Sequence, residues 1–260
     1  MCKVLNVASQ KGGVTKTTTV LNLATALGLM GKKVLAVDLD PQGSLTICAG
    51  VQNPDNLIHT VYTLLNAALD ENELPEPSEY IIPSEKIDVI PCNDKLAAFE
   101  LNRGHEVGAE RALQMVINPL RELYEIIIID TPPSLGLLTV NALTASDSVL
   151  IPVTPQLLSA VGLKMLIRRI QKVQKFVNPA LVIEGVLMAM CDTRTNLYKE
   201  VSTIMDKTYS QSIRIFDTII PHSTKVGEAN LRRQSVLLYD ENSKPAKAYQ
   251  EFAKELMMSA

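Results

Sequence analysis

The sequence lacks the features of a membrane-spanning, secreted or disulfide-linked protein. None of its apolar runs reaches the ~18 residues that a membrane-spanning helix needs, and its start, MCKVLNVASQ, lacks the charged-then-apolar layout of a signal peptide. The four cysteines, Cys2, Cys48, Cys92 and Cys191, are scattered without a CxxC pair. We therefore expect reduced thiols in a cytoplasmic protein, with no disulfide framework and no cysteine metal site.

The sequence also lacks a strong excess of either charge. The formal net charge is −3, so any binding of nucleic acid would have to come from a local basic patch. With 260 residues, of which 47% are hydrophobic and 20% charged, the chain suits a well-cored globular domain. It shows no internal repeat and no domain break, and we expect one domain over residues 1–260.

Apolar, β-branched runs alternate with helical patterns along the chain. The runs predict strands at Val4–Ala8, Val34–Val37, Ile87–Ile90, Ile126–Ile129, Val149–Val153, Val182–Leu187 and Ile215–Ile220. Apolar positions three and four apart predict helices at Leu21–Leu29, Ala109–Leu123, Leu157–Phe176 and Leu197–Lys207. This alternation predicts an α/β fold: a doubly wound, mainly parallel sheet with helices on both faces. The stretch Asp70–Pro83, rich in Pro and Glu, is expected to be a surface excursion.

Residues 9–19, SQKGGVTKTTT, join the first predicted strand to the first predicted helix. A glycine-containing turn at a helix N-terminus binds phosphate because it presents free N–H groups and the positive end of the helix dipole. We expect Lys16 to reach the β- and γ-phosphates and the Thr17 hydroxyl to coordinate Mg²⁺. The general pattern GxxxxGK[ST] is broken at both glycines, by Gln10 and Thr15, so a turn that merely starts a helix is the alternative.

Acidic residues follow two of the predicted strands. Asp38 and Asp40 come after Val34–Val37, and Asp130 comes after Ile126–Ile129. Ligands of parallel sheets bind where the strands run out. We expect Asp130 to hold Mg²⁺ directly or through water. Asp40 is expected to orient or activate an attacking water and to belong, with Thr17 and Asp130, to the Mg²⁺ site. Asp38 is expected to be a structural or metal-shell partner, and a plain turn residue is the alternative for each carboxylate.

The second lysine, Lys11, makes KGGVTKTT resemble the deviant Walker A motif, KGGxGKTT, of the ParA/MinD-type ATPases. The resemblance continues in family order through DLDPQGS and IIIIDTPPSLG, which are similar to its switch I and switch II. It extends through IDVIPCNDKLAAFE, LIPVTPQLLSAVGL, GVLMAMCDTRTNL and IIPHSTKVGEA, and it is greatest toward the Soj-like partition ATPases. Thr15 departs from the family glycine. We expect a negative φ there, with the Thr15 hydroxyl capping the following helix.

The resemblance implies an ATPase that binds Mg·ATP and forms a sandwich dimer, with slow hydrolysis unless a ParB-like partner stimulates it. Lys11 would reach the phosphates of the partner subunit's ATP and act with Lys16 and Asp40 in catalysis. The phosphates would lie on Lys11, Gly12, Gly13, Val14, Thr15, Lys16, Thr17 and Thr18. The adenine would lie against Met190, Pro221 and Ser223, with His222 at the edge of the pocket.

The resemblance further implies binding of the ATP-bound dimer to DNA without sequence preference, hence association with the nucleoid. Arg194 and Lys225 match family DNA-contact arginines, and Arg232 and Arg233 could extend this patch. Independently of the family, KMLIRRIQKVQK predicts a helix with a basic face of Lys164, Arg168, Lys172 and Lys175. A solvated helix face is the alternative there.

Other functions of the same superfamily remain as alternatives. A MinD-like membrane-cycling ATPase needs a basic amphipathic C-terminal anchor, whereas the tail here has mixed charges, and we expect it to form a helix that closes over the domain. An iron–sulfur reductase is excluded because no cysteine lies between Cys92 and Cys191. An ATP-binding regulatory switch with little hydrolysis stays open, because Thr15 could affect hydrolysis without affecting binding. The sequence does not indicate the partner or the DNA cargo.

Overall fold

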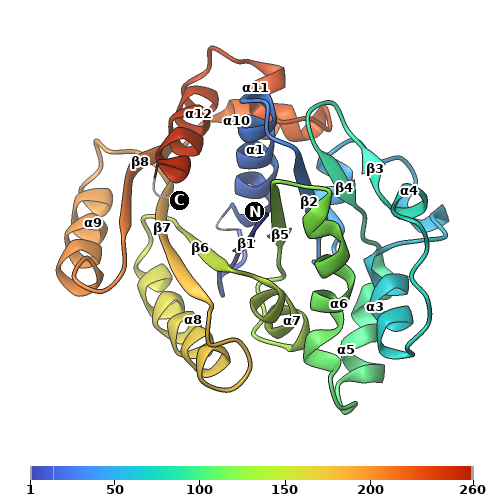
Figure 1. Ribbon diagram of the computed structural model, residues 1–260. Coiled ribbons are helices and arrows are strands. Elements are labelled where there is room, and N and C mark those ends of the chain that lie inside the picture. Colours follow the sequence, from blue (N-terminus) through green and yellow to red (C-terminus); the bar gives the residue numbers. More distant parts are fainter. Residues whose placement is uncertain (1, 14, 259–260) are drawn as a thin grey trace.

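The strands form a single twisted sheet. The computed structural model describes residues 2–13 and 15–258, so Val14 of the predicted phosphate loop lies outside the described residues. The strands are β1 Lys3–Val7, β2 Val34–Asp38, β3 Ile82–Pro83, β4 Asp88–Ile90, β5 Ile126–Asp130, β6 Ser148–Val153, β7 Val182–Cys191 and β8 Ile215–Pro221. Their order is β3-β4-β2-β5-β1-β6-β7-β8, and of these neighbours only β3 and β4 pair antiparallel (Figure 1). The predicted doubly wound, mainly parallel α/β fold is confirmed.

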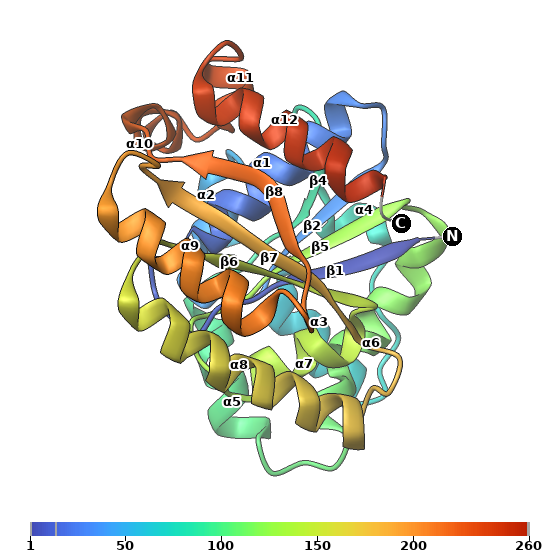
Figure 2. The same cartoon turned by 90° about the vertical axis from the view of Figure 1, so that its left-hand side faces the viewer.

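Helices cover both faces of this sheet. They are α1 Lys16–Leu29, α2 Ser44–Cys48, α3 Val61–Leu69, α4 Pro77–Tyr80, α5 Ala97–Arg103, α6 Ala112–Ile117, α7 Leu137–Ala145, α8 Leu157–Phe176, α9 Asn196–Tyr209, α10 Thr224–Leu231, α11 Val236–Tyr239 and α12 Lys244–Met257. One core packs α1, α11 and α12 on one face of the sheet, with α10 at its edge. Two further cores pack α3, α6 and α7, and then α8 and α9, on the opposite face (Figures 1 and 2).

Two segments differ from their predictions in detail. The helix predicted at Ala109–Leu123 is broken into a 3₁₀ turn, α6 and a second 3₁₀ turn over Asn118–Glu122. Pro119 lies in that last turn, where it lacks the N–H that would continue an α-helix. The expected surface excursion at Asp70–Pro83 contains α4 and β3, and Tyr80 within it is buried. Tyr80, together with the partly buried Leu74 and Ile81, therefore ties this polar stretch to the core.

The C-terminal helix α12 lies against the sheet beside β8 and α1 (Figure 2). Its apolar residues Tyr249, Phe252, Ala253 and Leu256 are all buried. The expectation that this tail closes over the domain is confirmed. No helix in the part of the chain that the structure describes is both long and apolar enough to cross a membrane.

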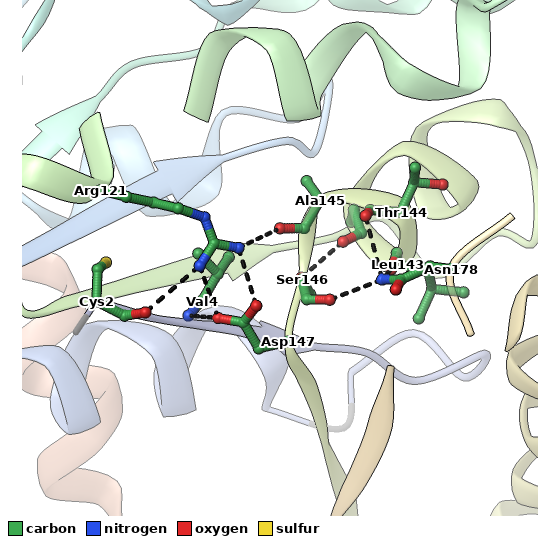
Figure 3. Close-up of polar contacts among 10 residues, drawn as sticks. Cys2, Val4, Arg121, Leu143, Thr144, Ala145, Ser146, Asp147 and Asn178 are labelled. Carbon is green, nitrogen blue, oxygen red and sulfur yellow. Dashed lines mark hydrogen bonds and ion pairs between the residues drawn. The ribbon is translucent and has the colours of Figure 1, made fainter. Parts of the chain in front are cut away.

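A polar clamp fastens the amino-terminal edge of the sheet (Figure 3). Arg121 donates to both carboxylate oxygens of Asp147 at 2.9 Å, and Asp147 also accepts the Val4 N–H at 2.7 Å. Beside it, the Asn178 amide donates to the carbonyl oxygens of Leu143, Thr144 and Ser146. These contacts join β1, β6 and the end of α7. The opposite edge, where the parallel strands end, is left for the loops that carry the candidate site.

Candidate functional site

A pocket of about 520 Å³ opens at the carboxyl-terminal edge of the sheet. It is bordered by residues of the phosphate loop and α1, of the loop after β2 and α2, and of the loops after β7 and β8. Most residues that were expected to contact ATP or the attacking water border it: Gly12, Gly13, Thr15, Lys16, Thr17, Thr18, Asp40, Met190, Pro221 and Ser223. His222, expected at the pocket edge, borders it as well. The fold therefore brings together segments as distant in the chain as Gly12 and Tyr249.

The pocket floor is formed where β1 passes into α1. Gly13 adopts φ 74°, a left-handed backbone that suits glycine. Lys16 begins α1 and is 93% buried, being only 7% exposed. Burial lowers the pKa of its ammonium group, and the charges of Asp130 and Asp40 oppose this shift. A buried cation next to the first free N–H groups of a helix makes this floor suitable for a polyanion.

Two buried carboxylates lie side by side beneath the loop. Asp38 and Asp130 end β2 and β5 and are partners in the parallel register, so their side chains share one face of the sheet. Burial raises the pKa of Asp38 to about 6, and the neighbouring Asp40 charge adds to this. Burial and the charge of Asp38 likewise raise the pKa of Asp130 well above its ordinary value. Burial and mutual repulsion disfavour the charged form of both carboxylates, so a cation bound beside them under the phosphate loop would be stabilised.

Thr17 connects the loop to this pair. Its hydroxyl donates to Asp130 Oδ2 at 2.6 Å, which leaves the lone pairs of Thr17 Oγ1 available to a cation. The second oxygen, Asp130 Oδ1, is buried and has no hydrogen-bond partner. Mg²⁺ is commonly held by one or two protein oxygens together with substrate phosphates. Thr17 and Asp130 fit that role, and no group of three or more His, Cys, Asp or Glu that could hold a metal ion occurs within residues 2–13 and 15–258.

Asp38 performs a structural task. Its Oδ2 accepts from the Thr46 N–H at 2.8 Å and from the Thr46 hydroxyl at 2.7 Å, and its Oδ1 accepts from the Asp40 N–H at 3.2 Å. Thr46 in turn accepts from the Cys92 N–H at 2.9 Å. This chain of bonds fixes α2 and the loop before it, and thereby places Asp40 at the pocket. Of the two roles expected for Asp38, these contacts correspond to the structural one.

The prediction for Thr15 was wrong. Thr15 precedes α1 with φ 65° and ψ 23°, in the left-handed region, and its hydroxyl makes no capping hydrogen bond. The Thr15 carbonyl accepts the Thr19 N–H at 2.7 Å, so the residue starts the helix through its backbone alone. The tight loop needs a left-handed residue immediately before Lys16, and this requirement overrides the preference of a β-branched residue for negative φ.

Lys11 does not border the pocket. Its ammonium group contacts Gln156 Oε1 at the start of α8, and a Cβ at Gly162 of the same helix would lie 3.8 Å from Gln10 Cβ. The front of the loop is thus turned toward α8, away from the pocket that Lys16 faces.

Sequence reasoning missed one whole wall of the pocket. Val226, Gly227 and Asn230 of α10 border it, together with Ser44 and Cys48 of α2 and Tyr249 of α12. Within α10 the spacing from Ser223 to Asn230 repeats every three to four residues, which is the signal that could have identified this face. The Ser223 hydroxyl is occupied in part as the α10 cap, because it accepts the Lys225 N–H at 3.2 Å.

Of the residues expected to contact DNA, Arg194, Arg232 and Arg233 are exposed and Lys225 is half-buried, and they do not form one cluster. Arg194 follows β7 and makes two 2.9 Å bonds to Asp192, while Lys225 starts α10 and pairs with Glu228 at 3.0 Å. Arg232 and Arg233 follow the other end of α10, roughly 10 Å away at 1.5 Å per residue. There they border a separate cavity of about 390 Å³.

The basic face of α8 has the expected arrangement. Lys164, Arg168, Lys172 and Lys175 are exposed, while Leu163, Leu166, Ile170 and Val173 are buried.

Comparisons with known proteins found similar sequences over nearly the whole chain. The family model described as an AAA domain matches residues 2–183. Sporulation initiation inhibitor protein Soj of Bacillus subtilis is 40% identical over 256 residues, covering 98% of both chains. Chromosome partitioning protein ParA of Myxococcus xanthus is 35% identical over 255 residues, covering 98% of this chain and 88% of that protein.

Solved structures share the fold. Cobyrinic acid a,c-diamide synthase from Mycobacterium smegmatis, with bound ADP and magnesium, is 36% identical with a TM-score of 0.84, covering 99% of this chain and 94% of that one. The septum site-determining protein MinD from Pyrococcus horikoshii, complexed with Mg-ADP, is 24% identical with a TM-score of 0.75, covering 98% and 96%. The second likeness concerns the fold alone.

Proposed function

This chain belongs to the ParA/Soj family of partition ATPases within the ParA/MinD superfamily, and on this premise we propose that it is a Mg·ATP-dependent DNA-partition switch. In this proposal residues 1–260 act as one ATPase unit. The ATP-bound chain dimerises and binds DNA without sequence preference. It dissociates from DNA when a ParB-like partner stimulates the slow hydrolysis of ATP.

The observation that carries the proposal is the contact between Thr17 and Asp130 next to the buried Lys16. Lys16 neutralises phosphate charge, and the Thr17 and Asp130 oxygens would hold Mg²⁺. When bound, Mg²⁺ supplies charge stabilisation for phosphoryl transfer. Asp40, held in the pocket wall by its 3.0 Å bond from the Gln42 N–H, orients a water molecule.

Lys11 has the across-dimer role in this proposal. It lies outside the pocket of its own chain, where its ammonium group contacts Gln156, and on dimerisation it would exchange this contact for the nucleotide of a second copy. Such a cation stabilises charge that develops on the transferred phosphoryl group. Hydrolysis then depends on dimerisation.

The proposal of DNA binding rests on cationic side chains at the carboxyl-terminal edge of the sheet and on α8. Arg194 and Lys225 are the principal candidates, with Arg232, Arg233 and the α8 face as extensions. The acidic neighbours of Arg194 and Lys225 must be displaced by phosphate, so affinity should depend steeply on salt.

The test is a gel shift of nonspecific duplex DNA with and without Mg·ATP, run beside calorimetric titration with Mg·ADP. Lys16→Ala should abolish nucleotide binding and the ATP-dependent shift, because a buried phosphate-facing cation is lost. Lys95→Ala, which removes an exposed lysine away from the pocket, is the matched control and should bind normally. Equal nucleotide affinity in Lys16→Ala and wild type would contradict the proposal.

A further inference from the structure

Thr15 places a hydroxyl group at an unusual position in the phosphate loop. Its Oγ1 is shielded from water yet has no hydrogen-bond partner among the residues that the structure describes, although the residue borders the pocket. Buried hydroxyl groups in folded proteins almost always have a partner, and a ligand that binds in the pocket would supply one here.

The helix does not use this hydroxyl either. A threonine before a helix normally adopts an extended backbone, and its oxygen accepts a hydrogen bond from the first turn. With φ 65° and ψ 23°, Thr15 makes no such bond to α1. The first N–H groups of α1 consequently find no acceptor in the Thr15 side chain, and its O–H remains free to donate.

Glycine would avoid both disadvantages of this arrangement. A left-handed backbone is strained for a β-branched residue, and a shielded hydroxyl without a partner is unfavourable. Both penalties fall on one residue, at the point where Lys16 and Thr17 enter the pocket. Strain at such a place is commonly balanced by an interaction that the site makes when it works.

We propose that the Thr15 hydroxyl donates a hydrogen bond to a phosphate oxygen of a bound nucleoside di- or triphosphate. This inference rests on the proposed function. Rotation about the Thr15 Cα–Cβ bond carries the hydroxyl between staggered positions without moving the loop. Thr15 thus adds a neutral side-chain donor to a phosphate site otherwise made of backbone N–H groups, Lys16 and Thr17.

The inference is tested with Thr15→Ala, Thr15→Ser and Thr15→Gly by calorimetric titration with Mg·ADP, which avoids hydrolysis. Thr15→Ala should bind about 10-fold more weakly, the typical effect of losing one hydrogen bond to a charged acceptor. Thr15→Ser keeps the hydroxyl and should stay within about 3-fold of wild type. Thr15→Gly should also bind more weakly, because it too lacks the donor.

Thermal unfolding of the nucleotide-free variants separates this role from a structural one. Thr15→Ala should unfold no earlier than wild type, because the lost hydroxyl had no partner, and Thr15→Gly should unfold later, because glycine accepts the left-handed backbone. The assignment would be overturned if the affinity of Thr15→Ala for Mg·ADP stayed within about 2-fold of wild type. It would also be overturned if Thr15→Ser bound Mg·ADP as weakly as Thr15→Ala. Wild-type protein that binds no Mg·ADP would overturn the proposed function as well, whereas tight wild-type binding with an unchanged Thr15→Ala removes the Thr15 role alone.

Discussion

At the scale of single residues, the pocket is distinguished by strained backbone. Thr15 at φ 65° and Met190 at φ 53° both border it, and neither is glycine. Met190 lies where the β7–β8 register shifts between Met188 and Cys191. Such an irregularity re-aims a side chain at a strand end, here toward the pocket that the base is proposed to enter. Strain at both ends of one pocket fits a site whose geometry is fixed before its ligand arrives.

Gly28 in α1 is a residue whose substitution tests packing directly. A Cβ at this position would lie 2.1 Å from the Lys86 carbonyl oxygen, which belongs to backbone and cannot move freely. We expect Gly28→Ala to lower the free energy of unfolding by about 1–3 kcal/mol, measured by urea denaturation. Gly162→Ala in α8 is the control: its Cβ meets only Gln10 at 3.8 Å, and stability should be unchanged or rise by up to about 1 kcal/mol. Equal effects of the two substitutions would contradict the expected clash.

At the scale of elements, α12 is fixed to β8 by one carboxylate. Glu255 accepts the N–H groups of Asp217 at 2.9 Å and Thr218 at 3.0 Å, and it pairs with Arg214 at 3.2 Å. The rings of Phe216 and Phe252 pack edge to face with their centroids 4.9 Å apart. Apolar and polar contacts therefore join the same two elements. The helix that closes the domain also supplies Tyr249 to the pocket wall, which couples this docking to the site.

This carboxylate should make stability depend on pH. Burial alone would raise the pKa of Glu255, but the bonds from Thr218 and Asp217 and the charge of Arg214 together lower it below its ordinary value. A group with a lowered folded-state pKa stabilises fully above its unfolded-state pKa, and that contribution is lost as pH falls through the folded-state pKa.

We therefore expect Glu255→Gln to lower the free energy of unfolding by about 1–2 kcal/mol at pH 7. The difference from wild type should shrink as pH falls below the ordinary pKa of glutamate, when wild type is protonated too. Thermal melts at several pH values measure this. Glu251→Gln, on the same helix and paired only with the exposed Lys254, should show almost no difference at any pH. A Glu255→Gln deficit that stayed constant down to pH 3 would be evidence against the charge argument.

At the scale of the whole molecule, an acidic chain must present cations locally to bind DNA. The net charge is −3, and the exposed Arg194 and the half-buried Lys225 are each paired with an acidic neighbour. Each pair lowers the local positive potential, and phosphate must compete with a carboxylate for the same cation. Affinity should then respond to both members of a pair, in opposite directions.

Substitutions in the Arg194–Asp192 pair test this balance. In fluorescence anisotropy with a random duplex and Mg·ATP, Arg194→Ala should weaken binding and reduce the dependence of log K on log salt by about 1. Asp192→Asn should tighten binding, because Arg194 loses its competitor. Lys254→Ala on α12 serves as the control for a lost exposed lysine. Weaker binding on Asp192→Asn would show that the pair acts as a structural unit instead.

What the sequence by itself determined is local or periodic. Continuous apolar runs predicted seven of the strands because strands buried on both faces leave no room for polar residues. Lys16, Thr17, Asp40 and Asp130 were expected at one edge because residues at the ends of parallel strands must meet there. Their meeting at this edge needed no coordinates; Asp130 lies beneath the phosphate loop, bonded to Thr17, and does not border the pocket itself.

Only the tertiary structure decided the rest. The left-handed backbone of Thr15 follows from how the loop enters α1, and a residue's own preference for negative φ does not reveal it. The α10 wall, the role of Asp38 beneath α2 and the position of Lys11 against Gln156 each depend on contacts between distant segments. Such contacts are set by packing across the whole sheet. The residues that make them are too far apart in the sequence for any short segment to contain both.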